Sequence, residues 1–297
     1  MKEFKIKALH EDLSRYEDEA LENLRKDLPV YHELQKLNLT IAEVRLSLAT
    51  LIDFQEDRHY CDHCPGLEAC AKMYPQHIMV LRKEGHFVER DFAPCEKKEA
   101  KTEAESLYAF RDFPDDWLGK DLRTLDKSGT RKEAIAAMAK IAQGQSRQWL
   151  YLVGNHRCGK SYIAATFANT LGKRKGYRAM CFCQTDAMID ELKRLSFDDK
   201  KGFEALMQRL ERTELLVLDG FGNEFKSDFV YSSILFPLIR SRAQEGRLTV
   251  FVSDFKIAEV VEMYSSKNIG AARAKQFKQL LQTQCGKEFD ITSAPLY

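Results

Sequence analysis

The chain has 297 residues, of which 44% are hydrophobic and 31% charged, with a formal net charge of +1. This composition supports a packed core in one or two domains, and so small a net charge excludes a bulk electrostatic attraction to nucleic acid or membrane. The sequence contains no run of 18 apolar residues, so we expect no membrane span, and its start lacks the apolar segment of a signal peptide. We therefore expect a cytoplasmic protein whose eight cysteines are reduced.

Residues 1–57 have the pattern of helices, with a break near Pro29. Thr40 and Glu43 have the spacing of a capping box, which predicts that a helix begins there. Apolar residues follow at helical spacing, namely Ile41, Val44, Leu48, Leu51 and Ile52. We expect this stripe to pack within its own domain rather than to bind a partner helix.

A cluster of cysteines follows in residues 58–95, and its members are Cys61, Cys64, Cys70 and Cys95. Clustered thiols in a reduced protein favour Zn²⁺, which four thiolate or imidazole ligands hold tetrahedrally. Cys95 would complete a Cys₄ set, whereas His77 would complete a Cys₃His set. Because either set is closed to substrate, we predict a structural zinc that stabilises a small helical domain over 1–95.

The segment Glu96–Glu105 is rich in Lys, Glu and Ala, which predicts a solvated linker or a frayed helix, and we place the linker at 96–109. From 110 to 297 strand and helix patterns alternate, which predicts an α/β domain with a parallel sheet flanked by helices. A helix is expected at Arg131–Ile141. The apolar runs expected to form buried strands are Trp149–Val153, Tyr177–Cys183, Leu215–Leu218, Leu248–Val252 and Phe289–Ile291.

A phosphate-binding loop follows the first of these strands and opens a helix. Its residues are Gly154, Asn155, His156, Arg157, Cys158, Gly159, Lys160 and Ser161, and Tyr162 joins the predicted nucleotide-binding set. The glycines let the backbone wrap closely around phosphate oxygens, and the helix N-terminus directs N–H groups at them. Lys160 would bind the β- and γ-phosphates, and the Ser161 hydroxyl would bind Mg²⁺. This strand–loop–helix context predicts a site for ATP.

The second half of the site is predicted at the ends of two later strands. Asp219 ends an apolar strand and would hold Mg²⁺ directly or through water. Glu224 is the nearest later acid that could orient the attacking water. Asp254 would either lie near the γ-phosphate or turn away to cap the next helix. Arginines that could complete the site, in cis or across a subunit interface, are Arg240, Arg242 and Arg273.

Taken together, these motifs resemble the DnaI/DnaC-type helicase-loader ATPases, the DnaI type in particular, over nearly the whole chain. The matching segments are Cys61–Cys70 for the zinc module, Trp149–Ser161 for Walker A, Leu218–Glu224 for Walker B, Phe251–Phe255 for sensor 1 and Ala271–Arg273 for sensor 2. The resemblance implies an AAA+ fold without the usual helical lid. It implies ATP-regulated loading of the hexameric replicative helicase onto single-stranded DNA in replication initiation or restart, with the zinc domain docking on the helicase. ATP-dependent self-association is a further expectation.

Three positions depart from the family's hydrolysis machinery. Gly220 replaces the second Walker B aspartate, Asp254 replaces the sensor 1 asparagine, and Tyr231 stands where an arginine is expected. We therefore hypothesise that ATP and Mg²⁺ bind but that hydrolysis is slow. The alternatives are a non-hydrolysing ATP-binding adaptor of the helicase and an IstB-type transposition helper ATPase, a family that has a basic DNA-binding N-terminus. Basic residues available for DNA phosphates are Lys200, Lys201, Arg273, Lys275 and Lys278.

Overall fold

The structure is a computed structural model that describes residues 6–127, 129–174 and 177–293. The chain divides into two compact units, Met1–Ala100 and Lys101–Tyr297, each of which is considered by itself. Within the described residues, no helix is both long enough and apolar enough to cross a membrane.

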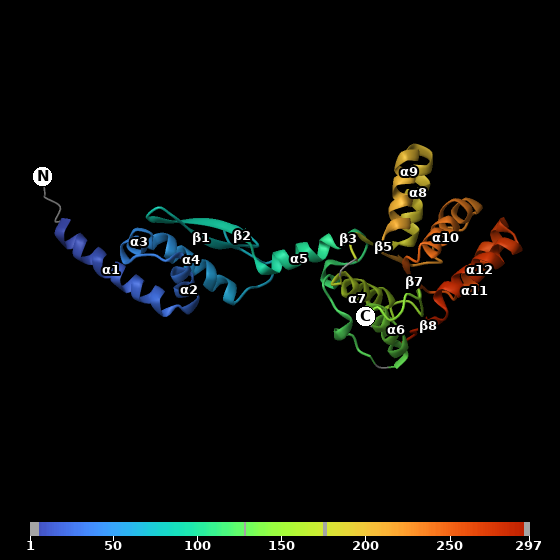
Figure 1. The fold of residues 1–297 in the computed structure, drawn as a ribbon, viewed down its shortest axis with the longest axis horizontal. Coiled ribbons are helices and arrows are strands. Elements are labelled where there is room, and N and C mark those ends of the chain that lie inside the picture. The colour runs from blue at the N-terminus through green and yellow to red at the C-terminus, as the bar shows by residue number, and fades with distance from the viewer. Residues whose placement is uncertain (1–5, 128, 175–176, 294–297) are drawn as a thin grey trace. The chain divides into compact units, whose positions relative to one another are not determined.

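Helices make up the first part of the N-terminal unit (Figure 1), and their bounds are α1 Ile6–Lys26, α2 Leu28–Leu37, α3 Ile41–Leu46 and α4 Leu48–Asp62. Asp27 separates α1 from α2, and its carboxylate accepts a hydrogen bond from the Val30 N–H at 3.3 Å. The predicted capping box is confirmed, because Thr40 Oγ1 accepts from the Glu43 N–H and Glu43 Oε2 accepts from the Thr40 N–H at 2.8 Å. The N-termini of α2 and α3 therefore each have the side-chain acceptor that a helix N-terminus needs.

The expected apolar stripe does not form one helix face, because the helix is interrupted at Ser47 between α3 and α4. Leu51 is buried, whereas Ile41 is 76% exposed. The Ser47 hydroxyl is buried and accepts from the Val88 N–H at 2.9 Å, so it ties this interruption to the neighbouring hairpin. The expectation that the whole stripe packs within its domain was therefore wrong for Ile41.

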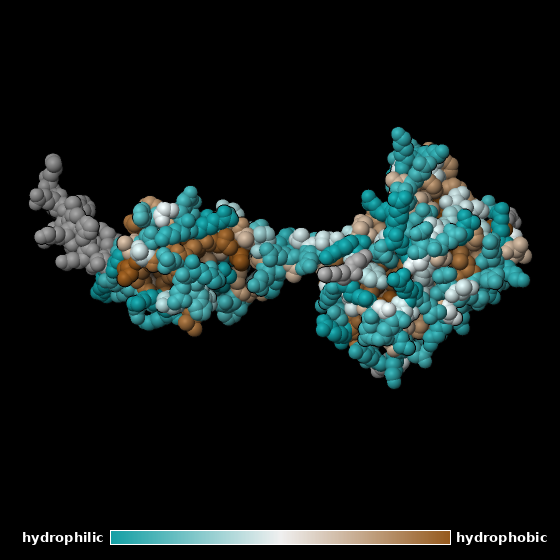
Figure 2. Space-filling view, in the orientation of Figure 1, coloured by the Kyte–Doolittle hydropathy of each residue, from teal (hydrophilic) through white to brown (hydrophobic). Residues whose placement is uncertain are grey.

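An antiparallel hairpin completes the N-terminal unit, with β1 at His77–Glu84 and β2 at Phe87–Pro94. Helices and hairpin share a small core of Leu24, Val30, Leu51, Phe54, Met79 and Val88. Apolar surface also remains uncovered on this unit (Figure 2), and its exposed large apolar side chains include Tyr16, Leu28, Ile41, Leu46, Met73 and Phe87.

The second unit is built on a parallel sheet, as the sequence predicted, and its six strands have the order β3-β5-β6-β7-β4-β8. The strand bounds are β3 Tyr108–Arg111, β4 Leu150–Val153, β5 Met180–Gln184, β6 Leu215–Asp219, β7 Leu248–Ser253 and β8 Glu288–Asp290. The four central strands are almost fully buried, which explains their continuous apolar runs. The expected strand over Tyr177–Cys183 begins three residues late, at Met180, and the edge strand β3 was not predicted.

Helices cover both faces of this sheet (Figure 1), and their bounds are α6 Lys132–Ala142, α7 Lys160–Gly172, α8 Thr185–Asp198, α9 Lys200–Arg212, α10 Phe236–Gln244, α11 Ile257–Tyr264 and α12 Ala271–Cys285. The helix α7 packs across β5, β6 and β7, and α8 and α9 form a hairpin that projects from the sheet. α5 (Glu96–Ser106) spans the boundary between the units, where a linker or frayed helix was expected. From α12 the described chain passes directly into β8, with no lid domain between them.

Arg242 on α10 is the largest fully buried side chain among the described residues. Its Nη1 donates to the carbonyl oxygens of Leu210 and Thr213, at 2.7 and 2.8 Å, at the C-terminal end of α9. Its Nε donates to Thr249 Oγ1 at 3.0 Å, and its Nη2 donates to the Leu248 carbonyl of β7. A cation at a helix C-terminus satisfies unpaired carbonyls and the helix dipole. Arg242 therefore joins α9, α10 and β7.

We predict that Arg242→Met lowers the free energy of unfolding of this unit by about 3 kcal/mol, because methionine fills much of the volume but leaves several buried carbonyls without donors. Urea denaturation followed by tryptophan fluorescence would measure this, since both tryptophans, Trp117 and Trp149, lie in the second unit. Arg240→Met is the matched control, because Arg240 lies on the same helix but is exposed, and we expect a change within about 0.5 kcal/mol. Equal stability of the two variants would contradict this role of Arg242.

Candidate nucleotide site

The phosphate-binding loop lies between β4 and α7 in the conformation that its glycines permit. Gly159 has a φ of 88°, in the left-handed region that favours glycine. A Cβ atom on Gly154 would lie 3.1 Å from the backbone nitrogen of Thr292, so a larger residue there would press on the neighbouring backbone. A cavity of about 330 Å³ opens beside the loop, lined by residues that include His156, Arg157, Gly159, Lys160, Ser161, Asp219 and Asp254. The loop, the end of β6 and the end of β7 therefore face a common cavity.

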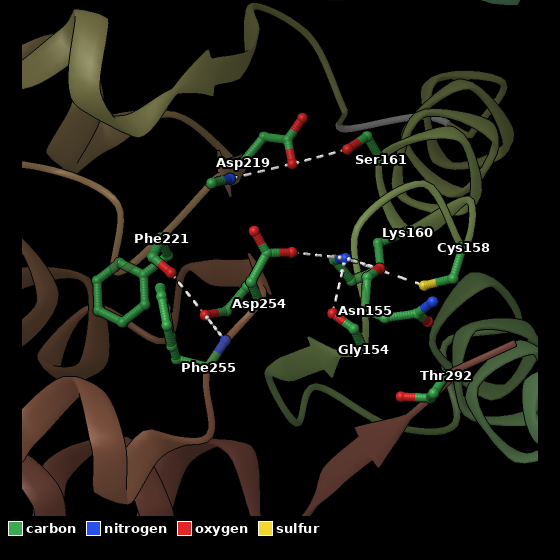
Figure 3. A network of polar contacts seen from close by, with 12 residues as sticks. Gly154, Asn155, Cys158, Lys160, Ser161, Asp219, Phe221, Asp254, Phe255 and Thr292 are labelled. Carbon is green, nitrogen blue, oxygen red and sulfur yellow. Dashed lines mark hydrogen bonds and ion pairs between the residues drawn. The ribbon is translucent and has the colours of Figure 1, made fainter. Parts of the chain in front are cut away.

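The Lys160 ammonium group is buried in the wall of this cavity and has three oxygen partners (Figure 3). Its Nζ donates to the carbonyl oxygens of Gly154 at 2.9 Å and Asn155 at 2.7 Å. It also forms an ion pair with Asp254 Oδ1 at 2.8 Å. The charge is thus held within the loop and is matched by one carboxylate.

Asp219 lies at the carboxyl end of β6 and faces the first turn of α7. The Ser161 hydroxyl donates to Asp219 Oδ1 at 2.9 Å (Figure 3), and the Gln184 amide donates to Oδ2 at 2.9 Å. Burial raises the pKa of the Asp219 carboxyl above its ordinary value, although hydrogen bonds from Ser161, Gln184 and the Gly220 N–H act in the opposite direction. A hydroxyl and a carboxylate in contact are the oxygen ligands that Mg²⁺ takes beside bound phosphates.

Several residues predicted from the sequence do not line the cavity. Glu224 is 1% exposed, and its carboxylate accepts from the Tyr264 hydroxyl and the Gly222 N–H, both at 2.7 Å. The Arg242 guanidinium group donates its hydrogen bonds to the carbonyls described above. Arg273 points instead to Asp228, with 3.0 Å between Nη1 and Oδ1. The structure thus gives none of the three direct access to the site.

Other residues reach the cavity that the sequence did not single out, namely Trp117, Gln184 and Asn223. Gln184 is the last residue of β5, and polar residues at the carboxyl ends of parallel strands are a general signal for a site. Trp117 lies in a short 3₁₀ turn before α6, and its ring meets Tyr162 edge to face at 5.4 Å between centroids. No sequence motif marks it, because its position depends on how the segment before α6 packs against α7.

The cysteine module has paired contacts between thiols and N–H groups. Cys70 Sγ accepts from the Gln76 N–H at 3.2 Å, and the Gln76 carbonyl accepts from the Cys95 N–H at 3.0 Å. Hydrogen bonds from the Gly66 backbone and from Lys97 lower the pKa of the Cys64 thiol. Across the part of the chain that the structure describes, no three His, Cys, Asp or Glu side chains are gathered closely enough to hold a metal ion.

The lysine and serine of the loop, the Asp219 carboxylate and the parallel sheet define a P-loop nucleotide-binding domain with an AAA+-type fold. The family model described as IstB-like ATP binding protein matches residues 113–273. The chain therefore belongs to the family of IstB-like ATP binding proteins, for which ATP is the ligand.

Individual proteins give a longer match. The chain is 21% identical over 281 residues to the replicative helicase loader DnaI of Bacillus subtilis (strain 168), covering 91% of this chain and 89% of that protein. A crystal structure of DnaI is 23% identical, with a TM-score of 0.55, and covers 63% of this chain and 98% of the other. A candidate primosome component from Streptococcus pyogenes serotype M3 is 19% identical, with a TM-score of 0.54, and covers 68% and 100%. These structures share the AAA+-type fold that the sequence predicted.

We predict that Asp219→Asn stabilises the nucleotide-free protein at pH 7 by about 0.5–2 kcal/mol, as often follows when a strained site residue is neutralised. The sign follows from the raised pKa. As pH rises above the ordinary pKa of 3.8, Asp219 loses its proton in the unfolded chain before it does so in the folded protein. The free energy of unfolding therefore falls until the pH passes the folded-state pKa, and it stays at this lower level above it. The gain in the variant should therefore shrink toward acid pH. The same variant should lose the rise in Tm that Mg²⁺ and ATP give the wild type.

Thermal melts with and without Mg²⁺ and ATP, between pH 4.5 and 7.5, would measure both effects. Asp186→Asn is the control, because Asp186 is an exposed carboxylate in the first turn of α8 and does not line the cavity. A loss of nucleotide-free stability in Asp219→Asn at pH 7 would contradict the prediction.

Proposed function

We propose that this protein is a loader of the replicative DNA helicase, and that ATP regulates its delivery of the hexameric ring to single-stranded DNA during primosome assembly in the cytoplasm. The observation that carries the proposal is the extent of the match to the Bacillus subtilis loader, which includes most of the N-terminal unit. The family model covers only 113–273, a region that transposition helper ATPases share. The N-terminal unit therefore favours a loader over an IstB-type helper.

Mg²⁺ would be held with ATP by the Ser161 hydroxyl and the Asp219 carboxylate, whose contact at 2.9 Å brings two suitable oxygen ligands together. Lys160 would bind phosphate oxygens from the loop side. These residues supply binding and orientation. Bound Mg²⁺ would neutralise charge on the phosphates.

We further propose that ATP hydrolysis is slow. Glu224 is already engaged by Tyr264 and Gly222, so it is not free to orient a water molecule at the cavity. Tyr231 is buried, and its hydroxyl donates to the Arg273 carbonyl at 3.1 Å, so this position offers no cation to the site. Each missing charge-stabilising group typically costs about 3 kcal/mol of barrier. The bound nucleotide, rather than the rate of ATP hydrolysis, would then determine the affinity for the helicase, as in the alternative of a non-hydrolysing adaptor.

DNA contact would use exposed basic residues of the second unit. Lys200 and Lys201 are exposed at the start of α9, at the tip of the projecting hairpin. Arg273, Lys275 and Lys278 lie along α12, although Arg273 is partly neutralised by Asp228. Such contacts would neutralise phosphates and make binding sensitive to salt. Arg240, exposed on α10, is the remaining candidate to complete a neighbouring subunit's site in ATP-dependent self-association.

Zinc binding by the N-terminal unit is a second proposal. The thiol donors fit Zn²⁺ in chemistry, and Gln76 links Cys70 to Cys95 through its own N–H and C=O groups. Lys72 Nζ lies 3.4 Å from Cys61 Sγ. Because the described thiols are not gathered around one point, metal binding would have to draw them together and would thereby order this small unit.

The loader proposal predicts that the full chain captures the host's replicative helicase more strongly with ATP and Mg²⁺ than with ADP or without nucleotide. Capture by the immobilised chain, with steady-state ATP turnover measured in the same samples, would test it. Lys160→Ala should lose the ATP-dependent increase, because the loop loses its phosphate-binding cation. Lys140→Ala, on the exposed side of α6, is the matched lysine control. Equal capture of the helicase in all nucleotide states, or no capture in any of them, would contradict an ATP-regulated loader.

The zinc proposal predicts about one zinc ion per chain, measured by elemental analysis of the purified protein. Cys61→Ser or Cys70→Ser should lose it. Comparing Cys95→Ser with His77→Ala would identify the fourth ligand. Because Gln76 links Cys95 to Cys70, we expect Cys95→Ser to have the larger effect. The contact of His77 Nδ1 with the Pro75 carbonyl, at 2.8 Å, leaves Nε2 as the nitrogen that could bind zinc instead. Metal-free protein that melts identically with and without added zinc would overturn the proposal.

A further inference from the structure

Asp254 follows β7, and its carboxylate occupies a position on Lys160 where phosphate oxygens would bind. The two side chains are 2.8 Å apart between Nζ and Oδ1, and both line the cavity beside the phosphate-binding loop (Figure 3). Cys158 Sγ lies 3.9 Å from Lys160 Nζ, and the other oxygen partners of Nζ are two loop carbonyls, Gly154 and Asn155. The ammonium group has three N–H donors, so this set uses all of them. A bound phosphate must therefore displace at least one partner.

Among the residues that the structure describes, Lys160 is the partner of the Asp254 carboxylate, and none competes with it for this group. The N-cap residue of the next helix, α11, is Lys256, and Glu259 Oε2 accepts from the Lys256 N–H at 2.7 Å. Capping by Asp254, one of the two roles expected from the sequence, is therefore not what the structure shows. The magnesium ligand pair, Ser161 and Asp219, is complete without it.

The backbone on both sides of Asp254 is held in place. The Ser253 hydroxyl donates to the Phe221 carbonyl at 2.6 Å and accepts from the Phe255 N–H at 3.0 Å. The Tyr151 hydroxyl donates to the Phe255 carbonyl at 2.8 Å. The carboxylate is therefore fixed close to the loop, and any release from Lys160 must come mainly from rotation of its own side chain, which is 33% exposed.

The effect of the Lys160–Asp254 ion pair on nucleotide binding depends on the number of phosphates in the nucleotide. A nucleotide with two phosphates can bind the loop amides and helix N-terminus, and its terminal phosphate can replace one loop carbonyl on Lys160 while Asp254 keeps its contact. A third phosphate brings further negative charge to Lys160 beside the Asp254 carboxylate, and like charges at close range repel each other, so this carboxylate must rotate away. The cost falls on ATP and not on ADP.

We propose that Asp254 is a specificity-determining residue of this site, an internal counter-ion that makes the cavity bind ADP in preference to ATP. The inference rests on the proposed function only in taking adenine nucleotides as the ligands. The default state of the protein is then the ADP form, and binding ATP requires the carboxylate to leave Lys160. Reaching the ATP form costs a rotation of the Asp254 side chain, which follows β7, the strand that lies between the loop strand and the Asp219 strand.

Equilibrium titration of the full chain with fluorescent ADP and with a fluorescent, non-hydrolysable ATP analogue, in Mg²⁺ and in EDTA, tests this. The wild type should bind ADP more tightly. Asp254→Asn keeps an oxygen that can accept from Lys160 but removes the charge, so it should shift the ADP-to-ATP affinity ratio toward ATP by about tenfold. Asp254→Ala should shift it in the same direction. Asp186→Asn removes one exposed carboxylate outside the cavity and should leave the ratio unchanged.

An unchanged ratio in both Asp254 variants, with nucleotide still bound, would overturn this inference and leave the proposed loader function standing. Weaker ATP binding by Asp254→Asn in Mg²⁺ but not in EDTA would also overturn it, because it would make Asp254 a metal ligand. Absence of nucleotide binding in every protein, including the wild type, would overturn the inference and the proposed function together.

Discussion

Parallel pairing of β6, β7 and β4 as neighbours is the constraint on which the site depends. Parallel strands end at the same edge of a sheet, so the loop after β4, Asp219 at the end of β6 and Asp254 after β7 meet there. Each strand is buried on both faces, and the hydrophobic burial of these apolar runs fixes their order and register. Buried polar groups at this edge, each of which would be unfavourable without a partner, are thereby held in contact with one another.

The charged side chains at the carboxyl edge of the sheet are each matched by a partner. Lys160 is matched by Asp254, and Asp219 is surrounded by the neutral donors of Ser161, Gln184 and Gly220. A cavity prepared for a polyanion and a divalent cation would otherwise contain a buried, unpaired ammonium group, which is strongly unfavourable. The nucleotide-free fold thus contains its own substitute for a phosphate, and ligand binding becomes an exchange of anions on one lysine.

The arginines and acids outside the cavity have structural roles that explain their sequence context. Arg242 satisfies the end of α9, and Glu224 pairs with the buried Tyr264 hydroxyl. Tyr231 packs on Phe236, with 5.4 Å between ring centroids. The region that could carry hydrolysis in an AAA+ ATPase therefore stabilises the fold here. The slow hydrolysis proposed above would suit a nucleotide-dependent binding partner rather than a fast enzyme.

The sequence by itself determined the parallel sheet, the phosphate-binding loop, the Asp219 strand and the capping box at Thr40, because each depends on local periodicity or on residues a few positions apart. Only the tertiary structure decided that Asp254 faces Lys160, that Arg242 and Glu224 are buried elsewhere, and that Trp117 reaches the cavity. These outcomes depend on side-chain direction and on packing between segments distant in the chain, which no local pattern encodes.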